Sequence, residues 1–301
     1  MNAVATGMRP LERPPESMRP DRPEVITPLG GGPTVAIAPG VVFECLVGKH
    51  NQARQLTTGL VRFDPAACLP YHTHPFSESI TLLGGEAHVE VEGRCYELRR
   101  LDNIVVPPDV PHAARNSVRH GSAVFHIAMA TDSPSRTLVY GEFSSQFMPD
   151  SFAGQAGAER VNRTASAARF AAAPNTEFVD FFNQELLPGM EMSGGYGLFH
   201  PGSRLPAHVH DFDESICIID GTATCVVEGR RYTLSNAATA MVPRGRVHYF
   251  INESTGPMAM LWVYAGPMPI RIVVDERCAT VEGDPWRAPQ TETAVTGQRG
   301  E

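Results

Sequence analysis

The sequence predicts an all-β protein made of two related units in tandem. Short extended segments separated by turn residues run from about residue 41 to 145 and again from about 177 to 274, which is typical of β-sandwiches and barrels. Turn residues repeat at a constant offset of 136, as in Gly85 and Gly221. The same offset relates two sets of polar residues, which are His72, His74, Glu78 and His112 in the first unit and His208, His210, Glu214 and His248 in the second. An internal duplication of one β unit explains these observations.

Composition places the chain among ordinary globular proteins. Its 301 residues leave room for two domains that each bury a core, and 42% of them are hydrophobic. No apolar run reaches membrane-spanning length, so we expect no membrane partner. The first residues lack the apolar core of a signal peptide, which makes the cytoplasm the expected compartment. The formal charge of −8 gives no reason to expect a nucleic-acid partner.

The chain begins with residues 1–33, which are dense in proline and glycine. This composition argues against a regular element and predicts a flexible arm. Such an arm is able to contact another subunit, so a homo-oligomer is left open.

The two β units are expected at 34–150 and 177–283. Residues 87–92 of the first unit alternate apolar and polar side chains, as a half-buried strand does. In the second unit, Asp220-Gly221 is a strong signal for a hairpin turn.

The remaining segments connect or end these units. The linker, residues 151–176, is rich in alanine and arginine without strand alternation, which predicts one or two helical turns. Residues 284–301 form a polar tail that we expect to be frayed.

The repeated histidines have the spacing of metal ligands. Two histidines one residue apart on a strand project from the same face, because side chains alternate with period two. Three imidazoles and one carboxylate suit a divalent first-row metal and leave positions for water or substrate. A single buried histidine is more often a hydrogen-bonded core residue, but the duplicated spacing favours metal binding. We expect up to two ions per chain, with Fe, Mn or Ni favoured and Co or Zn also accepted by these ligands.

At these residues the chain resembles a bicupin, a protein with two cupin domains. The cupin motifs are G-x5-H-x-H-x3,4-E-x6-G and G-x5-P-x-G-x2-H-x3-N. The second copy matches at Gly202, His208, His210, Glu214, Gly221, Pro243, Gly245, His248 and Asn252, and the first at His72, His74, Glu78, Gly85, Pro107, His112 and Asn116. Four positions depart from the motif glycines, namely Ala66, Leu101 and Asp109 in the first copy and Ala237 in the second.

The resemblance implies a fold and a class of chemistry. It implies two antiparallel jelly-roll barrels joined by the short helical linker, each barrel with a metal near its centre. The ligand set is similar to that of quercetin dioxygenases and oxalate decarboxylases. Because one site often carries the chemistry in duplicated cupins, the closer motif match favours the second copy as the catalytic one.

Three functions are compatible with these ligands. The first is a dioxygenase that holds a small enolisable or phenolic substrate and dioxygen at the metal. The alternative is a redox-neutral enzyme, such as a decarboxylase, isomerase, lyase or C–N hydrolase, in which Glu214 or Glu78 moves the proton as catalytic residue. The third is a non-catalytic small-molecule binding or storage protein, against which two complete ligand sets argue.

Some other residues are weaker candidates. His126 is equivalent to Trp262 at the offset of 136, and both would line the cavities if that strand face points inward. Arg62, Arg115 and Arg246 are candidate anchors for an anionic substrate, although each is more easily explained as a surface residue. The single lysine of the chain, Lys49, is explained by nucleotide-composition bias.

Overall fold

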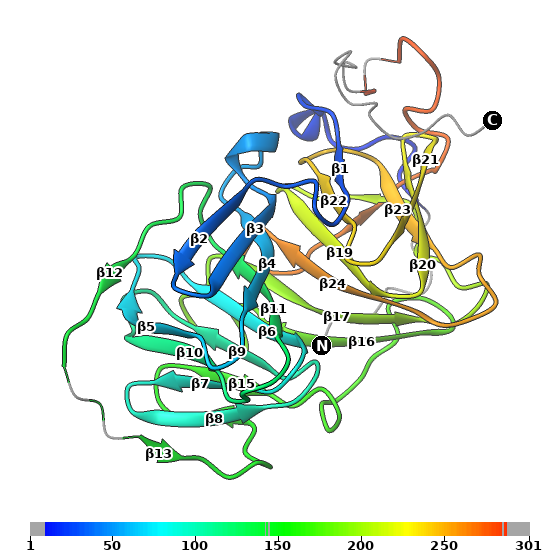
Figure 1. The fold of residues 1–301 in the computed structure, drawn as a ribbon. Helices are drawn as coiled ribbons and strands as arrows, with labels where there is room; N and C mark the ends of the chain where they lie inside the picture. The colour runs from blue at the N-terminus through cyan, green and yellow to red at the C-terminus, as the bar shows by residue number, and fades with distance from the viewer. Residues whose placement is uncertain (1–9, 142, 144, 285, 288–301) are drawn as a thin grey trace.

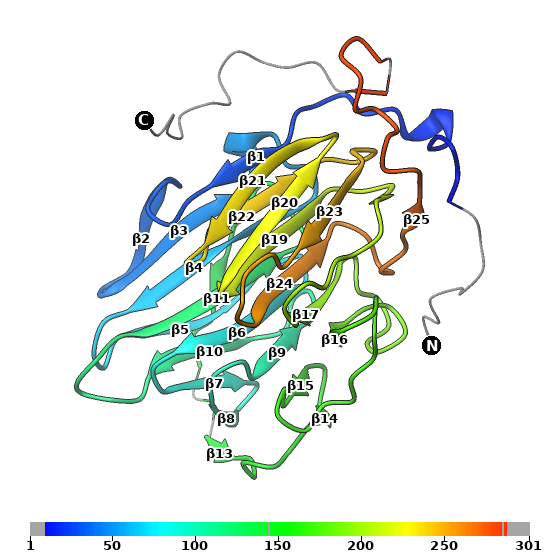
Figure 2. The same cartoon turned by 90° about the vertical axis from the view of Figure 1, so that its right-hand side faces the viewer.

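The structure is a computed structural model that describes residues 10–141, 143, 145–284 and 286–287. It contains two β-barrels packed against each other, each built from two sheets (Figures 1 and 2). Within the described residues the only helical elements are two 3-10 turns, η1 (Glu16–Met18) and η2 (Lys49–Asn51). The predicted all-β class with two jelly-roll barrels is therefore confirmed. No helix in this described part is long and apolar enough to cross a membrane.

The N-terminal barrel consists of a larger and a smaller sheet. The larger contains, in spatial order, β14 (Gly154–Gln155), β15 (Arg160–Asn162), β9 (Asn103–Val106), β6 (Glu78–Gly84), β11 (Ala123–Met129), β4 (Thr57–Phe63), β3 (Val41–Val47) and β2 (Thr34–Ala38). The smaller contains β12 (Thr137–Leu138), β5 (Cys68–Thr73), β10 (His112–Asn116), β7 (Ala87–Val91), β8 (Arg94–Leu98) and β13 (Gln146–Phe147). Within the described residues the strands pair antiparallel, apart from β13, which runs parallel to β8.

The C-terminal barrel repeats this plan. Its larger sheet contains β1 (Val25–Thr27), β22 (Thr239–Val242), β19 (Glu214–Asp220), β24 (Met258–Tyr264), β17 (Ser193–Phe199) and β16 (Thr176–Phe182). The smaller contains β21 (Arg230–Ser235), β20 (Thr222–Val227), β23 (His248–Ile251), β18 (His208–Val209) and β25 (Ile272–Val273).

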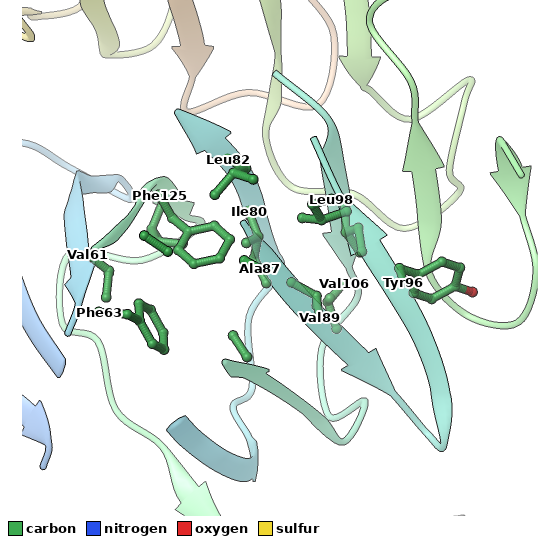
Figure 3. Packing of buried hydrophobic residues seen from close by; sticks show 14 of the residues in the cluster. Val61, Phe63, Ile80, Leu82, Ala87, Val89, Tyr96, Leu98, Val106 and Phe125 are labelled. Carbon is green, nitrogen blue, oxygen red and sulfur yellow. The ribbon is translucent and has the colours of Figure 1, made fainter. Parts of the chain in front are cut away.

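Alternation along the strands separates the barrel interiors from the interface between barrels. In β11, Phe125 and Ile127 belong to the N-terminal core, whereas Ala128 faces the other way. Figure 3 shows Phe63, Phe125 and Ile80 of this core directed toward one another. The opposite faces of the two larger sheets meet in a separate apolar cluster, which includes residues of β9, β16 and β24. This burial on both faces explains the nearly continuous apolar runs of these strands.

Each barrel receives a strand from the segment that precedes the other barrel. β1 precedes the N-terminal barrel but pairs with β22 of the C-terminal one, and β15 precedes the C-terminal barrel but pairs with β9 of the N-terminal one. The prediction of a flexible arm without regular structure is therefore wrong where β1 joins a sheet of the C-terminal barrel, and Met18 and Arg22 in the same segment are buried. Residues 1–9 of that arm and residues 285 and 288–301 of the predicted tail lie outside the described residues.

A buried carboxylate anchors each exchanged strand to the recipient barrel. Glu159 accepts hydrogen bonds from Arg94 at 2.7 and 2.9 Å and from the hydroxyl of Tyr96. Glu24 accepts the equivalent bonds from Arg230 at 2.8 and 3.0 Å and from Tyr232 at 2.7 Å. The two barrels thus use the same Arg-x-Tyr pair, at the offset of 136, to hold the same type of anchor.

The predicted helical linker is also wrong. Residues 151–176 contain β14, β15 and turns, and they contain no helix. Val161 is buried in the N-terminal core, and the amide of Asn162 donates to Asn103 Oδ1 and to the Phe181 carbonyl, both at 2.9 Å. These tertiary contacts outweigh the modest helix propensity of an alanine-rich segment.

The four residues that replace motif glycines keep the left-handed backbone conformation that glycine favours. Ala66, Leu101, Asp109 and Ala237 have φ angles of 57°, 69°, 62° and 61°. The left-handed region costs a residue with a Cβ roughly 1–2 kcal/mol, so the fold is retained at these turns against local strain. At the turn of Gly245 a Cβ would in addition lie 1.8 Å from the Met18 carbonyl oxygen, where the N-terminal segment crosses the barrel.

Candidate metal centres

The N-terminal barrel brings its four predicted ligands together in its interior. His72 in β5 lies opposite His112 in β10, Glu78 begins β6, and His74 lies in the turn between β5 and β6. All four are buried, and one donor atom of each lies within 4.8 Å of the others.

The C-terminal barrel builds the same cluster. His208 in β18 lies opposite His248 in β23, His210 follows in the next turn, and Glu214 begins β19. Their donor atoms again lie within 4.8 Å of one another, and all four are buried.

Backbone carbonyls fix the orientation of all six imidazoles. Each Nδ1 lies 2.7–2.9 Å from a carbonyl oxygen, for example Pro70 for His72, Pro206 for His208 and Ile270 for His210. Since a carbonyl only accepts, each Nδ1 donates its proton, and each Nε2 is directed toward the cluster. Such an outer hydrogen bond is the usual partner of a metal-binding histidine.

The centres have a shortage of positive charge that a metal ion would correct. Glu78 Oε2 lies 3.1 Å from His74 Nε2 and 2.9 Å from His112 Nε2, and Glu214 Oε2 lies 2.6 Å from His248 Nε2. Two lone-pair acceptors at this separation repel each other unless a cation or a proton lies between them. His210 Nε2 lies 3.2 Å from the same Glu214 oxygen and is buried without a hydrogen bond of proper geometry among the described residues. The donor sets therefore fit a divalent ion each.

The ionisation of the groups suits that role. In the metal-free site a proton on Nε2 takes the place of the cation: burial would raise the pKa of Glu78, but hydrogen bonds from His112 and His74 in their protonated form outweigh it and hold the pKa well below its usual range. The neighbouring histidines lower the pKa of Glu214 in the same way against its burial. Burial and the charge of His112 lower the pKa of His72 to about 4. At neutral pH both carboxylates are ionised and His72 is neutral, as metal coordination requires.

The two centres differ in the space beside the ligands. The N-terminal set lines a cavity of about 550 Å³, whose wall also includes Phe76, Phe125 and Met129. In the C-terminal barrel Tyr264 takes the place of Met129, since Tyr264 lies opposite Glu214 as Met129 lies opposite Glu78. Its ring centroid is 4.4 Å from that of His210 and its hydroxyl interacts with Glu214, so the phenol fills the space next to these ligands.

This register corrects the predicted equivalence of His126 and Trp262. The paired residues show that the offset is 135 in the last strand of each unit, because one residue fewer separates Asn252 from β24 than separates Asn116 from β11. Trp262 therefore matches Ile127 and belongs to the C-terminal core, whereas His126 is buried on the opposite face of β11. His126 does not line the N-terminal cavity.

The predicted arginine anchors have other partners. Arg62 pairs with Asp64, Arg115 pairs with Glu90, and Arg246 is fully buried against Glu24 and Glu228. Arg246 is thus a core residue rather than a surface one. The cations that do line the N-terminal cavity are Lys49 and Arg136, which no motif singled out.

Metal removal is expected to destabilise the protein measurably. An ion that binds only the folded state, at 100 times its Kd, stabilises that state by about 2.7 kcal/mol for each site. Chelation should therefore lower the Tm by roughly 5 °C or more. Elemental analysis with differential scanning calorimetry checks this, with up to two equivalents of metal per chain expected. A Tm that chelation leaves unchanged would contradict it.

Comparison with known proteins agrees with this geometry. The family model "Cupin domain" matches residues 59–127 and 195–264, one match in each barrel. The chain also shares a stretch of 56 residues, at 39% identity, with the endoribonuclease YbeY of Myxococcus xanthus (strain DK1622). It spans about a fifth of that relative's length, and each chain is covered to 19%.

Solved structures share the whole two-barrel fold. Oxalate decarboxylase from Lactobacillus farciminis, in a formate complex, has a TM-score of 0.67 at 14% identity, with 86% of this chain and 91% of that chain covered. Oxalate decarboxylase from Bacillus subtilis gives 0.66 at 14% identity, covering 86% and 81%. AerE from Microcystis aeruginosa gives 0.57 at 15% identity, covering 80% and 98%. With a cupin domain and a four-ligand cluster in each barrel, the chain belongs to the bicupins of the cupin superfamily.

Proposed function

We propose that the protein is a metal-dependent enzyme that catalyses a redox-neutral reaction of a small carboxylic or enolisable acid at its N-terminal centre. One observation carries this proposal: the N-terminal ligand cluster opens into a cavity of about 550 Å³, within the size range of small-molecule sites. The C-terminal centre, which the closer motif match favoured, has Tyr264 in the corresponding space.

The four ligands define what the centre would do. His72, His74, His112 and Glu78 would hold a divalent ion, and manganese is supported by the Mn(II) centres described for Bacillus subtilis oxalate decarboxylase. When bound, the ion would polarise a substrate oxygen and stabilise negative charge on it.

Residues beside the proposed metal would move the substrate's proton and hold the ligands in position. Glu78 is ionised between turnovers, so the carboxylate oxygen that is not directed at the imidazoles is available to accept a proton from the substrate and to return it to the carbon that carries the electron pair. In a decarboxylation the C–C bond to the carboxylate breaks and its electron pair stays on the remaining carbon. CO2 leaves, that carbon takes up a proton, and no external oxidant or reductant is needed. Phe76, stacked on His74 at a centroid distance of 4.3 Å, holds this ligand in position and keeps water from that side.

The reaction class differs from the sequence prediction, which placed a dioxygenase first. The solved structures with this fold include oxalate decarboxylases, and these favour the redox-neutral alternative. Their identity of 14% leaves the substrate open.

The test compares turnover with and without oxygen. Protein reconstituted with Mn(II) is assayed for CO2 release and product formation against a panel of carboxylic acids, in air and under strict anaerobiosis. We expect the anaerobic rate to stay within about twofold of the rate in air, because no redox step is involved. Turnover that stops without oxygen and consumes O2 in air would reject the proposal and identify the dioxygenase.

A further inference from the structure

The wall of the N-terminal cavity is apolar over most of its depth. Phe43, Val61, Phe63, Leu69, Phe125 and Ile127 contribute to it. A two-carbon acid such as oxalate would leave much of the 550 Å³ to water against these side chains, which is unfavourable. The wall is therefore complementary to a substrate with a large apolar body.

The charged groups of this cavity are confined to its two ends. The buried ligand cluster with Glu78 lies at the inner end, and the exposed Lys49 and Arg136, with the half-buried Asp132, line the outer end. Between them, the thiol of Cys45 is uncharged at neutral pH because burial raises its pKa to about 11. A ligand that spans the cavity thus meets charge at its ends and hydrocarbon in the middle.

The exposed end, which we call the mouth, carries an excess of positive charge. Among the described residues, neither Lys49 nor Arg136 forms an ion pair with a carboxylate. The Arg136 guanidinium instead donates to the Ile37 carbonyl in β2, which fixes it across the mouth. With Asp132 as the one acidic lining residue there, the mouth has a formal charge of +1. Lys49 follows the end of β3, whereas Ile37 lies beside the start of β3, so the two cations flank the mouth and their combined field attracts an anionic group.

We propose that the substrate of this site is an elongated acid with an apolar body, whose anionic end is held at the mouth by the field of Lys49 and Arg136 while its reacting end faces the ligand cluster. This inference rests on the proposed function for the location of the chemistry and adds the class and orientation of the substrate. It assigns a specificity role to the only lysine of the chain.

Ligand binding to the full-length, metal-loaded protein tests this inference. Decanoate mimics the apolar body with its anionic end, and decan-1-ol is the uncharged control. By isothermal titration calorimetry we expect decanoate to bind more tightly than decanol. The double substitution Lys49→Met with Arg136→Met should weaken decanoate about five- to tenfold, since two exposed charge contacts are lost, and should leave decanol within about twofold. The matched control Arg231→Met, at an exposed ion pair of the other barrel, should change neither.

The single lysine permits a second measurement that does not depend on the variants. Reductive methylation with 13C-formaldehyde labels Lys49 and the α-amine, so decanoate should shift the Lys49 methyl resonance in NMR spectra and decanol should not. Equal binding of acid and alcohol, or no binding of decanoate, would overturn the inference. Binding that His112→Ala abolishes and the mouth variants leave intact would overturn the orientation. Because no turnover is measured, these results are distinct from an oxygen requirement, which would overturn the proposed function.

Discussion

Replacing His112 by alanine should lower turnover more than 100-fold, whereas His248→Ala should leave turnover within a few fold of the unsubstituted protein. Loss of an outer-shell partner of a metal ligand already costs 10–100-fold in affinity or activity, and loss of the ligand itself is expected to cost more. His112 and His248 are equivalent in their barrels, each with Nε2 directed at the carboxylate of its cluster. Steady-state kinetics of both variants measure the effect.

Metal analysis of the same variants separates catalysis from folding. Each variant should lose up to one equivalent of metal, from the barrel that carries the substitution, and keep the other. Because His248→Ala loses the ion of the C-terminal barrel, its Tm should also fall. The reverse result, an inactive His248→Ala with an active His112→Ala, would place the chemistry in the C-terminal barrel despite Tyr264.

Glu24→Gln should reduce the free energy of unfolding by about 3–5 kcal/mol, which is typical for removal of one partner from a buried ion pair. Glu24 is 4% exposed and accepts hydrogen bonds from Arg230 and Tyr232, and it also pairs with the fully buried Arg246. The substitution preserves the shape of the side chain but leaves two guanidinium groups with less negative charge. Chemical denaturation at pH 7 measures the effect.

The stability difference between Glu24→Gln and the unsubstituted protein should depend on pH in a defined direction. Burial would raise the pKa of Glu24, but the hydrogen bond from Arg230 and the charges of Arg246 and Arg230 lower it from 4.5. A lowered folded-state pKa stabilises the protein above the unfolded-state value, and this contribution is lost as pH falls through the folded-state value. The gap between Glu24→Gln and the unsubstituted protein should therefore narrow below about pH 4.5. Glu253→Gln, at an exposed pair with Arg231, should cost no more than about 1 kcal/mol and serves as control.

The parts of the fold that the sequence predicted correctly are those that depend on local spacing. Periodicity alone predicts that His208 and His210 project to the same side, and the constant offset predicts the same of His72 and His74; the side chains do converge, although His210 and His74 lie just after their strands. Family glycines mark left-handed turns, and even Ala237 keeps that conformation. These features need only a few neighbouring residues to be recognised.

The incorrect predictions involve contacts between distant segments. The proline-rich stretch around Val25 forms a strand only because β22 offers a free edge. The segment around Val161 is alanine-rich and helix-prone, but it forms a strand because it pairs with β9 and Val161 packs in the N-terminal core. The shift from 136 to 135 after Asn252 is one residue in a surface turn, yet it reverses which face of β24 points inward. No local pattern carries this information.

The exchanged strands also give the two barrels the connectivity of a domain-swapped pair. Glu24 and Glu159 lie 135 residues apart and each holds the leading strand of one repeat onto the other repeat. Two identical subunits that swap their first segments across a two-fold axis have this same connectivity. The present chain has the connectivity of such a swapped dimer within one polypeptide, so each barrel takes one strand of its larger sheet from the segment that precedes the other barrel.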